Sequence, residues 1–192
     1  MAKTADDGIP AWMVCVDILN KSKRELVTQA VETLESEVEA KRMDIKGSMV
    51  AVPDQSSDDE MKLFVIGQVL RNADQMRERY GGYIKEVHTK GPNATPQEVE
   101  SAERARLLLM AVEKIEILVG YSRQLDAWIN DASMEVAAKD PVEIFSKTSN
   151  SAERAELLGF ILRNQQMMKE EVFTQEERRI IGQAVERSQS RL

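Results

Sequence analysis

The chain has too few histidines and cysteines for most metal or nucleophilic chemistry. Its 192 residues include one His and one Cys. A single histidine, His88, cannot supply the two Glu-x-x-His motifs of a di-iron bundle, and together with the distant Cys15 it leaves no closed zinc ligand set. No nucleophile elbow or local partner accompanies His88, so no Ser-His-Asp or Cys-His arrangement is recognisable. We therefore expect no catalytic, metal-binding or cofactor-binding residues, and we expect that the protein is not an enzyme.

Long apolar runs are also missing. No uninterrupted apolar stretch approaches the roughly 20 residues that a membrane-spanning helix needs. The first ten residues, MAKTADDGIP, lack the apolar segment of a secretory leader. A lone cysteine cannot form an internal disulfide, which is typical of a reducing compartment. We expect no membrane partner and a location in the cytoplasm, or within a virion or another large intracellular assembly.

Basic charge and aromatic side chains are both in short supply. The 26 Lys and Arg are outnumbered by 33 Asp and Glu, which gives a net charge of −7. Nucleic-acid binding needs clustered cations, so a nucleic-acid partner is not expected. Only 2 Trp, 3 Tyr and 4 Phe stand against 10 Met. Methionine fills irregular gaps between helices, so this balance favours a helix-packed core over a shaped pocket for a small-molecule substrate.

The chain repeatedly carries a sequence signal for the first residues of a helix. Six times a Ser, Thr, Asp or Asn is followed three residues later by Glu, in the pattern of a capping box. In two of the six a proline occupies the first helical position, where its missing N–H costs nothing. The pairs predict an all-α fold; they are Ser22/Glu25, Ser57/Glu60, Thr95/Glu98, Asp140/Glu143, Asn150/Glu153 and Thr174/Glu177.

Apolar periodicity predicts an irregular bundle of six or seven helices with a long central helix over about 96–138. The apolar residues of this helix span a wide face, and we expect Leu108, Val112, Ile115 and Val119 to be buried. A second helix begins near residue 57 and is predicted to end or kink at Gly81-Gly82.

The composition divides the chain into three parts. Residues 1–45 are predicted to form an N-terminal helical arm, 46–56 a linker and 57–192 the bundle core; the alternative is one continuous domain. The linker holds Gly47 and Pro53, and its Met49–Val52 stretch is either an isolated strand or an extended connector.

A narrow apolar stripe runs along the predicted arm. Val27, Val31, Leu34 and Val38 lie three or four residues apart on a helix expected over 22–44, flanked by glutamates. One strongly apolar residue per turn suits a seam against a single neighbouring helix. We predict that this stripe binds a protein partner; the alternative is a hairpin packed within the same chain.

A ten-residue pattern occurs twice. Gly67-x-x-Leu70-Arg71-Asn72-x-x-x-Met76 recurs as Gly159-x-x-Leu162-Arg163-Asn164-x-x-x-Met168. Amphipathic helices draw on a small alphabet, so the match is either coincidence or a duplication. A duplication predicts that the two segments occupy equivalent places in the fold.

These observations predict a non-catalytic structural or assembly subunit that contacts copies of itself or a larger complex, with a homo-oligomer or a multi-subunit assembly as the expected state. The alternative is an adaptor or chaperone that binds a partner helix in a methionine-rich apolar groove. The methionines available for that groove are Met61, Met76, Met110, Met167 and Met168.

Overall fold

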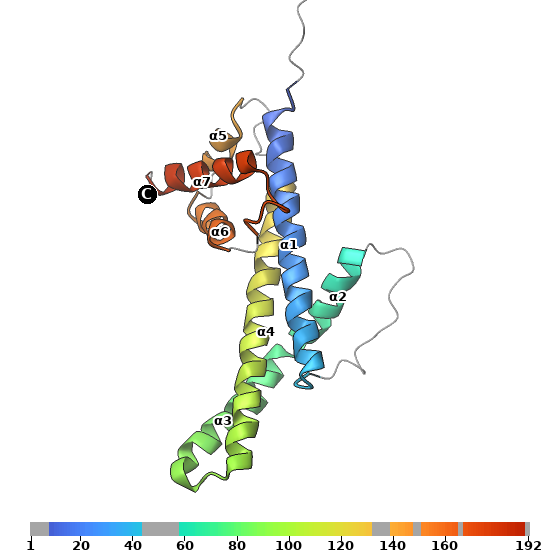
Figure 1. Cartoon of the computed structure of the whole chain (residues 1–192), viewed down its shortest axis with the longest axis vertical. Helices are drawn as coiled ribbons and strands as arrows, with labels where there is room; N and C mark the ends of the chain where they lie inside the picture. Colours follow the sequence, from blue (N-terminus) through green and yellow to red (C-terminus); the bar gives the residue numbers. More distant parts are fainter. Residues whose placement is uncertain (1–7, 44–57, 132–138, 148–150, 165–166, 191–192) are drawn as a thin grey trace, which may run out of the picture. The chain divides into compact units, whose positions relative to one another are not determined.

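A computed structural model describes residues 8–43, 58–131, 139–147, 151–164 and 167–190, and the predicted all-α fold is confirmed (Figure 1). The described residues form seven α-helices and one 3-10 turn, with no strand among them. The predicted linker 46–56 lies outside these residues. In chain order the elements are α1 (Ala11–Glu39), α2 (Asp58–Arg71), α3 (Ala73–Lys90), η1 (Gly91–Asn93), α4 (Pro96–Ile129), α5 (Pro141–Ser146), α6 (Ser151–Arg163) and α7 (Gln175–Gln189).

The chain forms two compact units. Met1–Glu25 and Tyr121–Leu192 make up the terminal unit, and Leu26–Gly120 make up the middle unit. This division does not coincide with the boundaries expected from composition, because α1 and α4 each continue from one unit into the other.

The predicted helix start at Ser22/Glu25 is wrong, because α1 runs without interruption from Ala11 to Glu39. Ser22 is fully buried, and its hydroxyl donates to the Ile18 carbonyl at 2.8 Å. A serine that bonds to the carbonyl four residues earlier is satisfied inside a helix and has no need to cap one.

The helix end predicted at Gly81-Gly82 is also wrong, since α3 passes through both glycines. The interruption falls at Asn72, whose φ of −95° and ψ of 0° leave the helical region. Asparagine competes for backbone partners through its side chain, whereas a helical glycine costs only about 1 kcal/mol relative to alanine.

The long helix ends earlier than predicted. It stops at Ile129, where the Asn130 side chain donates to the Asp126 carbonyl at 2.9 Å and the Asp131 N–H bonds the Trp128 carbonyl at 3.1 Å. Residues 132–138, into which the helix was expected to continue, lie outside the described part of the chain.

Two of the predicted capping boxes are confirmed by reciprocal hydrogen bonds. The Thr174 N–H donates to Glu177 at 2.8 Å and the Glu177 N–H donates to the Thr174 hydroxyl at 3.2 Å; Thr95 and Glu98 repeat the pattern at the start of α4. The Lys90 ammonium and the Thr95 N–H lower the pKa of Glu98 to about 2. Asp140 caps α5 through the Val142 N–H instead, and Ser57 and Asn150 lie outside the described residues.

In the terminal unit, α5 and α6 pack against α7. The Trp128 ring of α4 meets Phe145 of α5 edge-on at 5.3 Å between centroids. Glu177 is almost buried and joins two elements: one carboxylate oxygen completes the α7 cap and the other accepts from Lys21 of α1 at 2.7 Å.

In the middle unit, α3 and α4 are joined by η1. Ala73, Leu108 and Val112 form a buried cluster that also contacts Met43 and Tyr80. Ion pairs from Lys90 to Glu98 and from Arg77 to Glu116 connect α3 with α4. The four residues predicted to be buried on the long helix, Leu108, Val112, Ile115 and Val119, are confirmed at 3% exposure or less.

The C-terminus of α1 closes with a left-handed residue. Lys41 has φ +55°, its N–H bonds the Val38 carbonyl at 2.9 Å, and the Arg42 N–H bonds the Glu37 carbonyl at 2.9 Å. This is the hydrogen-bond pattern of a Schellman motif, in which glycine is the usual left-handed residue. A lysine there costs roughly 1 kcal/mol in backbone conformation.

The two copies of the Leu-Arg-Asn pattern are alike up to the asparagine and differ after it, because Met76 lies in α3 whereas Met168 lies in a turn. α2 ends at Arg71 and α6 ends at Arg163, each directly before the asparagine. In both copies the asparagine carbonyl accepts from the methionine N–H four residues later, at 2.9 Å for Met76 and 3.2 Å for Met168. The helix end and this one hydrogen bond are shared, and duplication stays a prediction.

We predict that Leu108→Ala lowers the free energy of unfolding by about 2–5 kcal/mol, because it empties a site 3% exposed. Urea denaturation followed by circular dichroism measures this loss. Leu162→Ala is the matched control, since Leu162 is 37% exposed, and should cost under about 1 kcal/mol. Equal losses for the two variants would contradict the burial of Leu108 on the core face of α4.

We predict that Cys15 is inert in the folded protein. The thiol is buried, with its sulfur 3.7 Å from the Pro141 carbonyl oxygen. Burial and the nearby Asp140 charge raise its pKa to about 12, and only the thiolate is nucleophilic. At pH 8 a disulfide-exchange reagent should label the chain only after urea is added; rapid stoichiometric labelling of the folded chain would refute this packing.

Candidate functional site

The predicted partner-binding stripe on α1 is divided by the fold. Val27 and Leu34 are buried, at 2% and 5% exposure, whereas Val31 and Val38 are half-buried. Two of the four side chains therefore already belong to the core of their own chain. The prediction that the stripe binds a partner is left open by this placement.

The buried face of α1 is centred elsewhere on the helix. Leu26 and Ala30 are fully buried, and the same face includes Gln29 and Glu37, at 4% and 6% exposure. At about 100° per residue, the centre of these four residues lies roughly 130° around the helix from Val31 and Val38. The predicted stripe located only the edge of the buried face, because it left out Leu26, Ala30 and the two buried polar residues.

A second apolar surface lies on α4, on the side opposite its core residues. Four large side chains are exposed there, all within the middle unit: Val99 at 53%, Leu107 at 36%, Met110 at 52% and Ile117 at 48%. We call these four residues the outer face of α4. A helix that is apolar on both sides is normally covered on both sides, so this face suits a protein contact.

The outer face follows coiled-coil spacing. Glu103, Leu107, Met110, Lys114 and Ile117 are separated by alternating steps of four and three residues. This is the spacing with which one helix packs along a single partner helix. The sequence carried this signal, but Leu107 was grouped with the inward residues of a wide apolar face, and the other side of the helix was overlooked.

An apolar groove borders one end of the outer face. It has a volume of about 390 Å³ and lies between α3 and the start of α4. Ile84 and Val87 form one wall and Val99 and Ala102 the other. The exposed side chain of His88 also lines the groove.

The methionines predicted to line an adaptor groove differ in how far their side chains are exposed to solvent. Met167 is fully buried, Met76 and Met168 are half-buried, and Met110 is exposed on α4. The side chain of Met61 lies outside the described ones. Among the described side chains of this set, Met110 is the exposed one.

Within the described ranges there is no group of three or more His, Cys, Asp and Glu side chains placed to hold a metal ion. A search of the same ranges finds no helix with the length and apolarity to cross a membrane.

We predict unequal losses of stability from two substitutions on the α1 stripe. Leu34→Asp places a charge at a site 5% exposed and should destabilise the fold by about 3 kcal/mol or more, whereas the half-buried Val31→Asp should cost less than half as much. Thermal unfolding of both variants measures the difference. If Val31→Asp keeps the native melting temperature but reduces the native mass of a complex, the stripe binds a partner; equal destabilisation of both would place Val31 in the core.

Comparison with known proteins gives no match: no protein-family model matches the chain, and neither a curated protein nor a solved structure matches it significantly.

Proposed function

We propose that this protein is a non-catalytic assembly subunit that contacts copies of itself through the outer face of α4. The observation that carries the proposal is the set of four large apolar side chains exposed on one side of a helix whose other side is already core. Their exposure to water is unfavourable by roughly 25 cal/mol for each Å² that a partner would cover.

A second copy of the same chain is the occupant that the pattern favours. When two α4 helices run antiparallel about a two-fold axis midway between Leu108 and Leu109, Leu107 of each copy meets Met110 of the other. In the same register Glu103 of each copy lies opposite Lys114 of the other, so unlike charges flank the apolar centre. Alternate a and d positions face one another in this way in antiparallel coiled coils, and a two-fold interface must be self-complementary.

The groove beside Val99 extends the same match. In this register Ile117 of the second copy lies opposite the residue after Val99. The 390 Å³ groove is lined by apolar side chains there. Ile117 is 48% exposed in the single chain, so the groove offers it a place out of water. The contact would be repeated on the other side of the axis.

A larger assembly needs a second contact surface on each subunit. In the terminal unit, the first turn of α1 exposes Trp12 at 37% and Met13 at 45%, directly after Ile9 at 72%. We propose this patch as a second contact, because two separate patches per subunit allow growth beyond a dimer.

The proposal is tested by the native mass of the purified chain at about 100 μM, measured by light scattering after size exclusion; at that concentration even a micromolar dimer is populated. The wild type should be a dimer or larger. Leu107→Glu should lower the native mass, because it removes the α4 contact, with unchanged helical content. Leu162→Glu is the matched control, because Leu162 is a leucine of equal exposure on α6 (37% against 36%) and should leave the mass unchanged. A monomeric wild type would refute self-assembly.

Charge exchange tests the register separately. Glu103→Lys should weaken the dimer because it places two lysines opposite one another, and Lys114→Glu should do the same with two glutamates. The double variant restores unlike pairs and should recover most of the association. Failure to recover would reject this antiparallel register while leaving self-assembly through α4 intact.

A further inference from the structure

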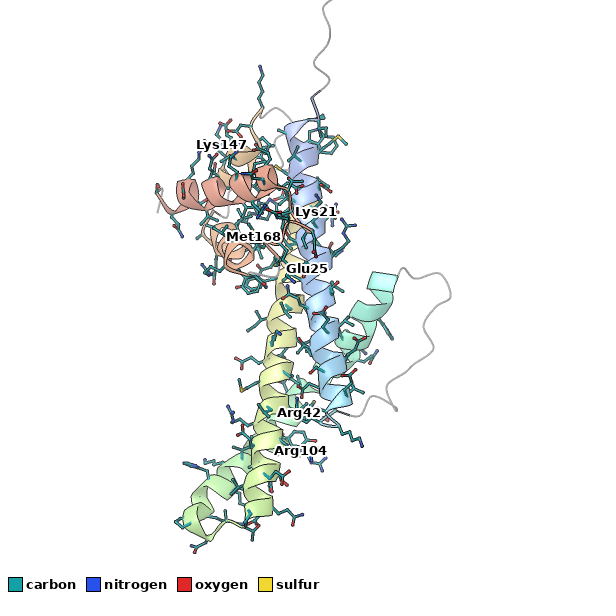
Figure 2. All side chains as sticks on the ribbon, viewed as in Figure 1. Lys21, Glu25, Arg42, Arg104, Lys147 and Met168 are labelled. Carbon is teal, nitrogen blue, oxygen red and sulfur yellow. The ribbon has the colours of Figure 1, made fainter. Side chains whose placement is uncertain are left out.

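A polar pocket in the middle unit is not used by the proposed assembly contact. It has a volume of about 260 Å³ and lies where the end of α1 meets α3 and α4. Figure 2 shows two of its residues, Arg42 after the end of α1 and Arg104 on α4. Its polar lining consists of three cations and three hydroxyl groups: Lys41, Arg42, Arg104, Tyr80, Tyr83 and Ser101.

The cations of this pocket exceed the anions that neutralise them. Arg42 is held by Glu37, with Nε at 2.6 Å and Nη2 at 2.9 Å from its carboxylate oxygens. That pairing fixes the guanidinium and leaves its Nη1 donors unbonded among the described residues. Lys41 and Arg104 have no ion-pair partner in the described part of the chain. In a protein of net charge −7, an uncompensated local positive charge of this kind is unusual.

The negative end of α1 does not cancel this charge. The carbonyls of Glu37 and Val38, which would repel an anion, already accept N–H groups in the closing turn. Lys41 supplies the left-handed residue of that turn, with φ +55°, although glycine would adopt this conformation without strain. Lysine is therefore unfavourable for the backbone at a position where its side chain lines the pocket.

We propose that this pocket binds the phosphate group of a small organic ligand. Lys41, Arg42 and Arg104 would neutralise the dianion, and the hydroxyl groups of Tyr80 and Ser101 would donate to its oxygens. Guanidinium and ammonium donors together suit a tetrahedral oxyanion with several acceptor positions. The rings of Tyr80 and Tyr83 provide apolar walls for the organic part of the ligand. This ligand site is independent of the outer face of α4.

Titration calorimetry on the purified full-length chain at low salt tests the site, with inorganic phosphate, AMP and adenosine as probes. Phosphate and AMP should bind in the millimolar range or tighter, and adenosine should not bind. Arg104→Gln should weaken AMP binding about tenfold or more, the effect of losing a charge-assisted hydrogen bond. Arg106→Gln is the matched control on the same helix, because Arg106 pairs with Glu103 and does not line this pocket.

Lys41→Gly separates a binding role from a structural one. Glycine relieves the left-handed conformation, so the variant should melt at a higher temperature than the wild type while its AMP affinity falls. A higher melting temperature with unchanged AMP affinity would overturn the role of Lys41. Absence of phosphate and AMP binding, equal binding of adenosine, or equal losses in Arg104→Gln and Arg106→Gln would overturn the site. Leu107→Glu should retain AMP binding, which keeps this result separate from that of assembly.

Discussion

The middle unit depends on how α4 distributes its apolar side chains. Leu108, Val112 and Ile115 build the core on one side, and Leu107, Met110 and Ile117 remain exposed on the other. One layer of neighbouring helices covers only one side of a helix, so an additional apolar side requires another neighbour or remains in water. This surplus relates the fold to the proposed assembly function, because the same helix that organises the core also offers the contact.

Polar interactions fix where the elements begin and how they join. Glu177 is the clearest case, since one almost buried carboxylate caps α7 and also pairs with Lys21 of α1. A buried carboxylate is tolerated only when its oxygens are hydrogen-bonded, and here both oxygens have donors. Glu37 resembles it in the middle unit, where its carboxylate holds Arg42 in place at the rim of the polar pocket. Each unit thus contains a buried glutamate with a specific structural task.

Each of the two proposed sites includes a feature that is unfavourable for the folded monomer. The outer face of α4 leaves large apolar side chains in water, and the polar pocket accepts a lysine in a left-handed turn. Neither choice benefits the isolated chain. Residues that are unfavourable for the folded monomer but placed together on one surface are the pattern expected of sites selected for binding.

The sequence by itself determined the all-α class, the long helix that begins at Pro96 and the capping boxes of α4 and α7, because these depend on residues within one or two turns of each other. It also determined that Leu108, Val112, Ile115 and Val119 share a buried face. Tertiary structure decided the rest. Ser22 continues a helix because burial and the Ile18 carbonyl satisfy it, and Glu37 is buried where it accepts from Arg42. These outcomes depend on which neighbour covers each face of a helix, and periodicity along one helix carries no information about that neighbour.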